Sequence, residues 1–220
     1  MSELNLDQAR FNMIEQQVRP WDVMDQQVLD LMSKLTRENF VPDTYRDLAY
    51  ADIDVPVADN QIMLAPKFVA RLLQGLQVQA EESILEIGTG SGYLTALLAQ
   101  LGKQVDSVDV RSDFTEQASN RLNALNIENV SLSTGDAING WNTDKKYDVI
   151  VLTGSVPILK SHFQQQLNVG GRLFAFVGQA PVMQACVITR LSADSFSTDI
   201  LFENLIPALD GAPEPEAFVL

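Results

Sequence analysis

The stretch Leu85-Glu86-Ile87-Gly88-Thr89-Gly90-Ser91-Gly92-Tyr93 decides how this chain folds. Its first residues are typical of a buried strand, and an apolar helical pattern begins at Tyr93, so the glycines form a strand-to-helix turn. Glycine adopts positive φ and lets a ligand approach the backbone with no Cβ in the way. Because open α/β sheets bind ligands at the carboxyl ends of their strands, this turn is a candidate ligand site.

The spacing of the glycines selects the ligand. A dinucleotide-binding turn reads G-x-G-x-x-G, whereas here the third glycine comes one residue early and Tyr93 stands in its place. A phosphate-binding loop would need Gly-Lys-Ser/Thr, which this turn lacks. The form acid-x-G-x-G-x-G is typical of S-adenosylmethionine, a ligand without phosphate whose methionine half is cationic. The sequence therefore predicts an S-adenosylmethionine site, with the Glu86 carboxylate beside the sulfonium and ammonium groups.

Two more carboxylates follow strands. Asp109 lies 21 residues after Gly88 at the end of the next strand, where a carboxylate can accept both ribose hydroxyls. Asp136 ends the third strand and is placed to accept the adenine amino group. One such acid would more often be a solvated loop residue or a helix cap, but acids at three successive strand ends favour a site. The expected cofactor site comprises Glu86, Gly88, Thr89, Gly90, Gly92, Asp109, Val110, Asp136 and Ala137.

The rest of the chain predicts a doubly wound α/β fold with a mostly parallel, seven-stranded sheet. Strands separated by helical patterns indicate parallel βαβ units, and the last two strands, joined without a helix, indicate an antiparallel edge. Pro66 is expected to begin a helix that Gly75 can end. Asp113 and Glu116 resemble a capping box. The expected strands are 83–87, 104–109, 130–134, 147–152, 172–177, 183–190 and 197–202, and the later helices 93–101, 113–124 and 159–167.

The first 50 residues are predicted to be a helical extension that packs on the α/β core at 51–220, giving one domain over 1–220. Apolar residues at helical spacing form two faces, and Pro20 and Pro42 interrupt the helices. A segment this short would be marginal alone, which is why we expect it to pack on the core. The two faces consist of Phe11, Ile14 and Val18, and of Val28, Leu31, Met32 and Leu35.

Composition excludes several classes. The formal charge of −14 disfavours nucleic acid as a partner, because binding to phosphate backbones relies on Lys and Arg. One His and one Cys leave almost no ligands for a zinc or iron site, so no metal is expected. We find neither an apolar run long enough for a membrane span nor a secretory signal pattern. A lone cysteine, Cys186, suits a reducing compartment, so a cytoplasmic location is expected. A monomer is expected because the sequence shows no sustained heptad pattern and no obvious exposed apolar helix face.

Over nearly its whole length the chain resembles the protein-L-isoaspartate O-methyltransferase family. The resemblance implies methyl transfer from S-adenosylmethionine to the free α-carboxylate of an isoaspartyl residue in a damaged protein. It further implies that the methyl ester so formed collapses to a succinimide, which permits repair of the backbone. A carboxylate is already a nucleophile at neutral pH, so no general base is required, and His162 is expected to play no part. The residues that carry the resemblance are Arg37–Pro42, Tyr45–Tyr50, Glu86–Tyr93, Gly135-Asp136 and Gly170–Leu173.

The chain departs from this family in the loop that precedes Pro66. Family members usually read Gly-x-Gly-Gln-Thr-Ile-Ser-x-Pro there, with the Thr and Ser hydroxyls next to the reacting groups. Here Gln61 and Pro66 are kept, but Ile62 and Leu64 replace both hydroxyls. The expected substrate-side residues are Gln61, Met63 and Leu64. Thr153 and Ser155, which follow the fourth strand, are the candidates for supplying the missing hydroxyl, although they could equally satisfy backbone at a turn.

Three functions therefore stay open. The first is isoaspartyl carboxyl methylation. The second is a methyltransferase with another carboxylate or a small molecule as acceptor, which the apolar Ile62, Met63 and Leu64 would suit. The third is a non-catalytic S-adenosylmethionine-binding protein.

Overall fold

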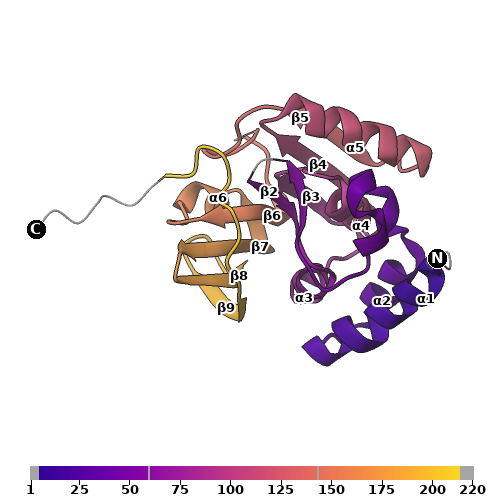
Figure 1. Cartoon of the computed structure of the whole chain (residues 1–220). Helices are drawn as coiled ribbons and strands as arrows, with labels where there is room; N and C mark the ends of the chain where they lie inside the picture. Colours follow the sequence, from indigo (N-terminus) through magenta and orange to yellow (C-terminus); the bar gives the residue numbers. More distant parts are fainter. Residues whose placement is uncertain (1–4, 59, 143, 214–220) are drawn as a thin grey trace, which may run out of the picture.

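The computed structural model describes residues 5–58, 60–142 and 144–213. Its centre is a seven-stranded sheet in the order β5-β4-β3-β6-β7-β8-β9. Figure 1 shows the β8–β9 edge of this sheet on the side away from the helices of the chain's first half. The strands are β3 (Ser83–Ile87), β4 (Gln104–Asp109), β5 (Val130–Thr134), β6 (Tyr147–Val156), β7 (Leu167–Gln179), β8 (Val182–Arg190) and β9 (Phe196–Glu203).

The sheet has the predicted mostly parallel topology. Strands β5, β4, β3, β6 and β7 run parallel, and β8 and β9 add the predicted antiparallel edge. The chain enters the sheet at β3, winds outward through β4 and β5, and then returns to the other side of β3 at β6. The carboxyl ends of β3 and β6 therefore form a topological switch point, the place at which such sheets bind ligands.

Helices cover the sheet as the βαβ pattern predicts, with shifted ends. Helix α3 (Pro66–Leu76) and helix α4 (Tyr93–Leu101) have the expected bounds. Helix α5 (Ser112–Ala124) starts one residue early after Arg111, and no side chain caps its start, so the predicted capping box is not formed. Helix α6 is a single turn (Ser161–Gln165), because the segment that follows it joins β7.

The expectation that Gly75 ends its helix was wrong. Helix α3 continues through Leu76, and it is Gln77 that takes the left-handed conformation. A Cβ on Gly75 would lie 2.6 Å from a methyl carbon of Leu201 in β9. The glycine is thus explained by close packing of a helix on a strand and not by a turn.

The N-terminal residues form the predicted helical extension. Helix α1 (Leu6–Met13) continues into a π-helical turn, and α2 (Gln26–Lys34) follows; Figure 1 places both beside α3 and α4. Met13, Val18, Val28 and Met32 are buried in the same apolar cluster as α3, α4 and one face of the sheet. Phe11, assigned to the buried face from its spacing, is instead 60% exposed. Among the described residues, no helix combines the length and apolarity needed to cross a membrane.

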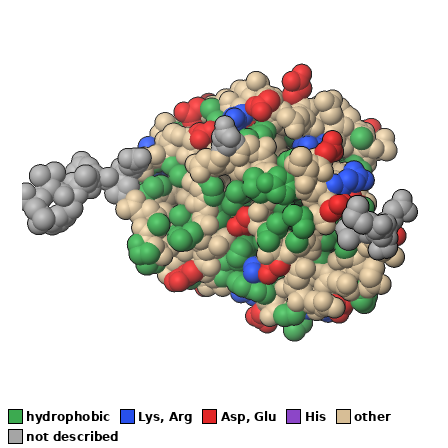
Figure 2. All heavy atoms as spheres, viewed as in Figure 1, with side chains coloured by type: hydrophobic (Ala, Val, Ile, Leu, Met, Phe, Trp, Pro, Cys, Tyr) green, Lys and Arg blue, Asp and Glu red, His purple; other side chains and the backbone are tan. Residues whose placement is uncertain are grey.

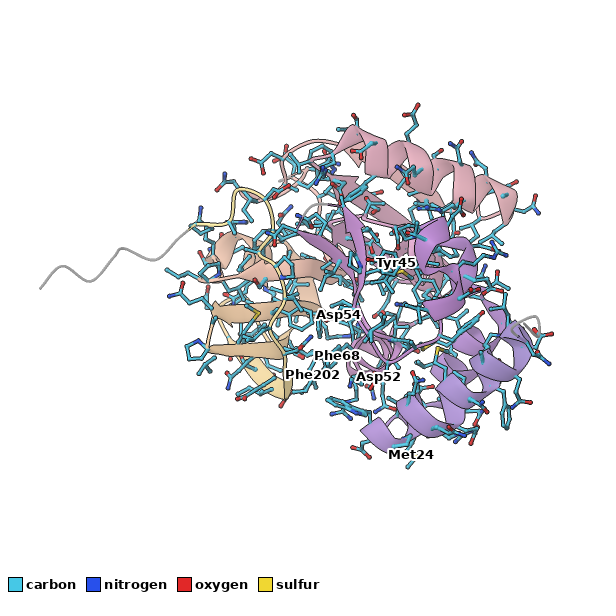
Figure 3. The ribbon with its side chains drawn as sticks, in the orientation of Figure 1. Met24, Tyr45, Asp52, Asp54, Phe68 and Phe202 are labelled. Atoms are coloured by element: carbon cyan, nitrogen blue, oxygen red, sulfur yellow. The ribbon has the colours of Figure 1, made fainter. Side chains whose placement is uncertain are left out.

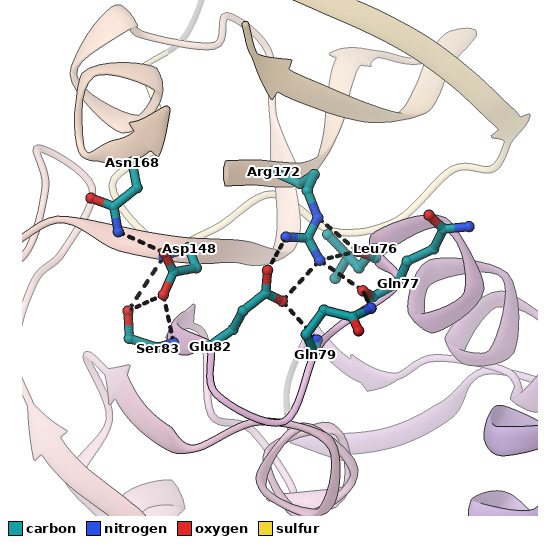
Figure 4. A network of polar contacts seen from close by, with 8 residues as sticks. All are labelled: Leu76, Gln77, Gln79, Glu82, Ser83, Asp148, Asn168 and Arg172. Carbon is teal, nitrogen blue, oxygen red and sulfur yellow. Dashed lines mark hydrogen bonds and ion pairs between the residues drawn. The ribbon is translucent and has the colours of Figure 1, made fainter. Parts of the chain in front are cut away.

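Polar contacts fix the amino-terminal edge of the sheet, opposite the switch point (Figure 4). Arg172 in β7 donates from Nε to the Leu76 carbonyl at 2.8 Å and forms an ion pair with Glu82, so it ties the end of α3 to the start of β3. Asp148 accepts hydrogen bonds from the backbone N–H and the hydroxyl of Ser83, both at 2.9 Å. These contacts hold β3 in register with β6 and thereby fix where the glycine turn emerges.

Candidate active site

A cavity opens at the carboxyl ends of β3, β4, β5 and β6. It encloses roughly 1000 Å³ counted out to its mouth, which is the size of a site for a nucleoside-sized ligand. One wall is the glycine turn, a second is formed by the ends of β4 and β5, and a third by the loop before α3 and a segment near the C-terminus. All predicted cofactor residues except Glu86 and Gly92 line this cavity.

The glycine turn depends on backbone conformations that other residues avoid. Gly88, Gly90 and Gly92 have φ of 97°, 50° and 81°. A Cβ on Gly88 would lie 2.0 Å from Thr153 Oγ1, and one on Gly92 would lie 2.9 Å from the Ala118 Cβ in α5. A Cβ on Gly90 would meet no atom within 4 Å, so Gly90 faces open space in the cavity. The turn therefore leaves bare backbone toward the cavity at Gly90, while Gly88 and Gly92 permit close packing against Thr153 and Ala118.

Asp109 is held rigidly at the end of β4. Its carboxylate accepts hydrogen bonds at 2.9 Å from the backbone N–H groups of Gly90 and Arg111. Burial raises the pKa of Asp109 above its ordinary value, and these two hydrogen bonds act in the opposite direction. A carboxylate has about four lone-pair positions, so Asp109 keeps free acceptor capacity toward the cavity. This arrangement suits a ligand with neighbouring hydroxyls.

The end of β5 supplies a second carboxylate. Asp136 accepts a hydrogen bond at 2.9 Å from the backbone N–H of Ile138, which leaves its other oxygen for a ligand. The adjoining Ala137 and Ile138 are buried and line the cavity, and the exposed Val110 lines it from β4. A flat apolar group with one polar edge would fit between these side chains.

Glu86 lies behind the cavity wall, and this corrects the expected contact with a cationic ligand. Its side chain is fully buried and accepts hydrogen bonds from the hydroxyls of Thr95 at 2.5 Å and Ser107 at 2.6 Å. The other carboxyl oxygen, Oε1, has no hydrogen-bond partner. Burial raises the pKa of Glu86 to about 8, with the two hydroxyls acting in the opposite direction. Glu86 is therefore a neutral group that joins β3 to α4 and β4 beneath the glycine turn.

This burial predicts a pH effect on stability. The unfolded chain releases the Glu86 proton near its ordinary pKa, whereas the folded chain keeps it up to about pH 8, so stability falls as the pH rises between these values. Glu86→Gln removes the ionisable group. Between about pH 5 and pH 8 the free energy of unfolding of this variant should therefore fall by roughly 2–4 kcal/mol less than that of the native chain. Urea unfolding without cofactor measures this, with the exposed Glu81→Gln as a matched control. Parallel stability curves for native chain and Glu86→Gln would contradict the assignment.

The substrate-side loop forms a hairpin that the sequence analysis did not predict. Strands β1 (Val55–Ala58) and β2 (Gln61–Met63) pair antiparallel and bring Gln61, Ile62, Met63 and Leu64 to the cavity. The strands are short and the first contains Pro56, so no alternating pattern marks them. Gln61, Met63 and Leu64 thus line the cavity, and their assignment to the substrate side stays a prediction.

Buried polar groups hold this loop from behind. Arg37, which is fully buried, donates to the carbonyl oxygens of Ala49 and Leu64, each at 2.8 Å. Asp54 accepts a hydrogen bond at 2.7 Å from the backbone N–H of Ala65. The guanidinium of Arg37 also lies 5.0 Å from the ring centre of Tyr93, the first residue of α4. Arg37 thus connects the N-terminal extension to two cavity-lining residues, Leu64 and Tyr93. The sequence did not suggest this role, because arginine is usually a surface residue.

A segment near the C-terminus, residues 205–211, closes the remaining side; we call it the strap. It pairs with the end of β6, where the Ser155 N–H donates to the Pro207 carbonyl and the Leu209 N–H donates to the Ser155 carbonyl, both at 2.9 Å. Ile206, Pro207, Leu209 and Asp210 line the cavity. The strap has no sequence pattern of its own, so the sequence analysis missed it.

The two candidate hydroxyls take different positions. Ser155 in β6 is buried, donates to the Ile206 carbonyl of the strap at 3.3 Å and does not line the cavity, which corrects its candidacy as a reacting group. Thr153 does line the cavity, but its hydroxyl is within hydrogen-bond distance of the carbonyls of Ile87 and Gly88, at 3.0 and 2.8 Å. Its geometry agrees with a hydroxyl that satisfies backbone at the turn.

Asp210 is a cavity residue that the sequence analysis missed. Its Oδ1 lies 3.5 Å from Nε2 of Gln61, across the cavity from the strap to the β1–β2 hairpin. His162, the single histidine of the chain, is not among the described residues that line the cavity. Within the described part of the chain, no three His, Cys, Asp or Glu side chains are grouped as metal ligands.

The switch-point cavity, the acid-preceded glycine turn and the carboxylates at the ends of β4 and β5 define a Rossmann-like methyltransferase. The chain belongs to the protein-L-isoaspartate(D-aspartate) O-methyltransferase family, whose sequence model matches residues 9–208.

Individual relatives agree with this family assignment. Protein-L-isoaspartate O-methyltransferase of Syntrophus aciditrophicus is 36% identical over 84% of this chain and 85% of its own length. Protein-L-isoaspartate O-methyltransferase 1 of Rhodopseudomonas palustris strain HaA2 is 37% identical over 94% of this chain and 88% of its own length. A solved Plasmodium falciparum β-aspartate methyltransferase in complex with S-adenosyl-L-homocysteine has the same fold, with a TM-score of 0.79, 18% identity, and 91% and 97% of the two chains covered.

Proposed function

We propose that this chain is an S-adenosylmethionine-dependent O-methyltransferase that acts on the α-carboxylate of L-isoaspartyl residues in damaged proteins. The observation that carries the proposal is the family match over 9–208, which includes both the glycine turn and the loop on the substrate side of the cavity. The predicted single domain over 1–220 is consistent with the apolar cluster shared by the N-terminal helices and the sheet.

The cavity residues fit the cofactor. When bound, S-adenosylmethionine supplies an electrophilic methyl group on a sulfonium sulfur. The free acceptor positions of Asp109 suit the ribose hydroxyls, and Asp136 with Ala137 suits the adenine edge. Gly88, Thr89 and Gly90 leave the backbone open to the methionine half, and Glu86 and Gly92 support this turn from behind.

The chain's own contribution to the reaction is positioning. An acceptor carboxylate is ionised at neutral pH, so one of its oxygens bonds to the methyl carbon as the carbon–sulfur bond breaks, and no protein base is needed. Holding nucleophile and methyl group in line can account for much of the rate. Arg37 and Asp54 fix the loop that carries Gln61 and Leu64, and we assign positioning of the acceptor to that loop.

The test is methyl transfer to a short isoaspartyl peptide, with the otherwise identical aspartyl peptide as control. Base-labile methyl esters on the isoaspartyl peptide alone are expected. Binding of S-adenosylhomocysteine, followed calorimetrically in parallel, separates the two parts of the proposal. Cofactor binding without transfer would overturn the substrate assignment, and absence of cofactor binding would overturn the whole proposal.

A second function is favoured by the apolar substrate side. Ile62 and Leu64 stand at the positions of the family's hydroxyl residues, and Ile206, Pro207 and Leu209 face the same space. An ionised acceptor there would lose hydration without gaining hydrogen bonds. Of the alternative acceptors, this wall therefore favours a more apolar small molecule over another carboxylate, and transfer to such small molecules but not to isoaspartyl peptides would identify a methyltransferase of that kind on this scaffold.

We further propose that the protein acts as a cytoplasmic monomer on polypeptides and does not bind nucleic acid. The formal charge of −14 disfavours nucleic acid, the single cysteine suits the cytoplasm, and the lack of a sustained heptad pattern in the sequence supports a monomer. Light scattering at micromolar concentration and a DNA-binding titration at low salt would test these statements.

A further inference from the structure

Three aromatic side chains from distant parts of the chain pack against one another, and two of them lie on the face seen in Figure 3. The ring centres of Trp21 and Phe68 are 5.3 Å apart, those of Phe68 and Phe202 are 5.1 Å apart, and Trp21 is 6.3 Å from Phe202. Figure 3 shows Phe68 and Phe202 side by side on this face. Trp21 keeps 36% of its surface exposed, which is unusual for the largest apolar side chain. Phe68 is itself buried and Phe202 is partly buried, so Trp21 supplies most of the exposed aromatic surface. We call Trp21, Phe68 and Phe202 the aromatic patch.

The aromatic patch is continuous with the substrate side of the cavity along two segments. Phe68 stands in the first turn of α3, four residues after the cavity residue Leu64 and next to the cavity residue Val69. Phe202 in β9 lies three residues before the strap, whose Ile206 lines the cavity. Figure 2 accordingly shows hydrophobic side chains gathered across the middle of this face. A polypeptide with one residue in the cavity can therefore leave it along a surface that ends at Trp21.

Among the described residues, the two cations next to the aromatic patch, Lys67 and Arg71, are both paired with carboxylates. Lys67 lies 4.6 Å from the ring centre of Trp21, but its ammonium is paired with Asp52 at 2.8 Å. Arg71 is paired with Asp22 at 3.3 Å. The exposed Glu203, next to Phe202, adds negative charge. Such a rim accepts an apolar side chain on a neutral or basic segment and repels an acidic one.

Two exposed apolar side chains lie close to patch members in the sequence. Met24 and Leu205 each lie three residues after a patch member, and their side chains are 68% and 54% exposed. Methionine adapts to differently shaped partners because it is unbranched and flexible. This combination is expected of a surface that receives varied apolar side chains, as a repair enzyme would meet in many different proteins.

We propose that the aromatic patch is a docking subsite for a large apolar side chain of the substrate polypeptide, a few residues away from the methylated one. The proposal rests on the proposed function, because it assumes that the cavity accepts a residue within a polypeptide. It assigns to Trp21 a role in substrate preference without contact to the reacting atoms.

A peptide series on the unaltered protein tests the proposal first. Each peptide carries one isoaspartyl residue in a Gly/Ser background and a single Trp at a different position, roughly two to six residues away on either side, since extended chain spans about 3.3 Å per residue. The value of kcat/KM should rise about 10-fold for one position or two adjacent ones, chiefly through a lower KM, as burial of one aromatic side chain allows. A flat profile with measurable turnover would overturn the docking subsite and leave the proposed function intact, whereas no turnover with any peptide would overturn the proposed function.

Variants then locate the effect. Trp21→Leu keeps an apolar side chain and Trp21→Ala removes it; both should abolish most of the gain for the preferred Trp peptide and leave kcat/KM for the Gly/Ser peptide and the affinity for S-adenosylhomocysteine unchanged. Phe11 is an exposed aromatic residue on α1, and Phe11→Ala is the matched control, which should leave kcat/KM unchanged for both peptides. An equal loss on both peptides would show a structural role only. A dimer in the native protein that Trp21→Ala converts to monomer would assign the aromatic patch to a second copy of this chain and overturn the proposal.

Discussion

Gly88→Ala should lower the affinity for S-adenosylhomocysteine by at least about 100-fold, which corresponds to about 2.8 kcal/mol. The added Cβ would lie 2.0 Å from Thr153 Oγ1, well inside van der Waals contact, at a residue whose φ of 97° already disfavours a side chain. Thr153 cannot simply rotate away, because its hydroxyl is within hydrogen-bond distance of the Ile87 and Gly88 carbonyls. The turn itself must therefore shift, and with it the backbone that faces the cavity.

The control for this variant is Gly170→Ala. Gly170 has a similar positive φ of 84°, but a Cβ there meets no atom within 4 Å, and the residue lies outside the cavity lining. It should cost about 1 kcal/mol of stability from backbone strain alone. Its affinity for S-adenosylhomocysteine, measured calorimetrically, should equal that of the native protein. Urea unfolding of both variants separates lost binding from lost folding, and native affinity in folded Gly88→Ala would show that the turn does not form the cofactor site.

The sheet could be predicted from the sequence because parallel strands are buried on both faces. Ser83–Ile87 and Tyr147–Leu152 are nearly continuous apolar runs, and helical spacing separates most of the strands, so strand positions and the antiparallel edge were confirmed. The positions of the glycine turn, Asp109 and Asp136 follow directly, since parallel strands end at one edge.

The position of Glu86 could not be predicted from the glycine motif. The register of β3 against β4 places Glu86 opposite Ser107, and helix α4 brings the Thr95 hydroxyl to the same oxygen. Neither partner belongs to the motif. A carboxylate that the sequence alone suggests is charged is therefore neutral and buried.

The substrate side was predicted least well because irregular backbone builds it. The strap has no periodic pattern and is held by the backbone of Ser155, while the β1–β2 hairpin is too short to show alternation. Arg37 has the side chain of a surface residue, and its burial is explained by the carbonyls of Ala49 and Leu64 that it satisfies. These contacts join segments that are far apart in the sequence.

Asp109→Asn should weaken S-adenosylhomocysteine binding by about 100-fold, from two losses that act together. The carboxylate accepts backbone N–H groups on both oxygens, so the amide nitrogen of Asn must face one of these donors and either the Gly90 or the Arg111 bond is lost. A hydrogen bond to a charged group contributes about 1.5–3 kcal/mol, and the ribose hydroxyls would lose a charged acceptor as well.

Asp106→Asn is the matched control, because Asp106 stands on the same strand and contacts Lys145 and Tyr147 outside the cavity lining. It should leave the affinity unchanged. Calorimetric titration of the native protein and both variants gives the comparison. Equal weakening of S-adenosylhomocysteine binding in both variants would assign the effect to strand stability. Native affinity in Asp109→Asn would show that Asp109 does not bind the ribose. A selective loss in Asp109→Asn would instead tie recognition of the cofactor to the one carboxylate that also fixes the glycine turn, so that the turn and the ribose site are ordered by the same side chain.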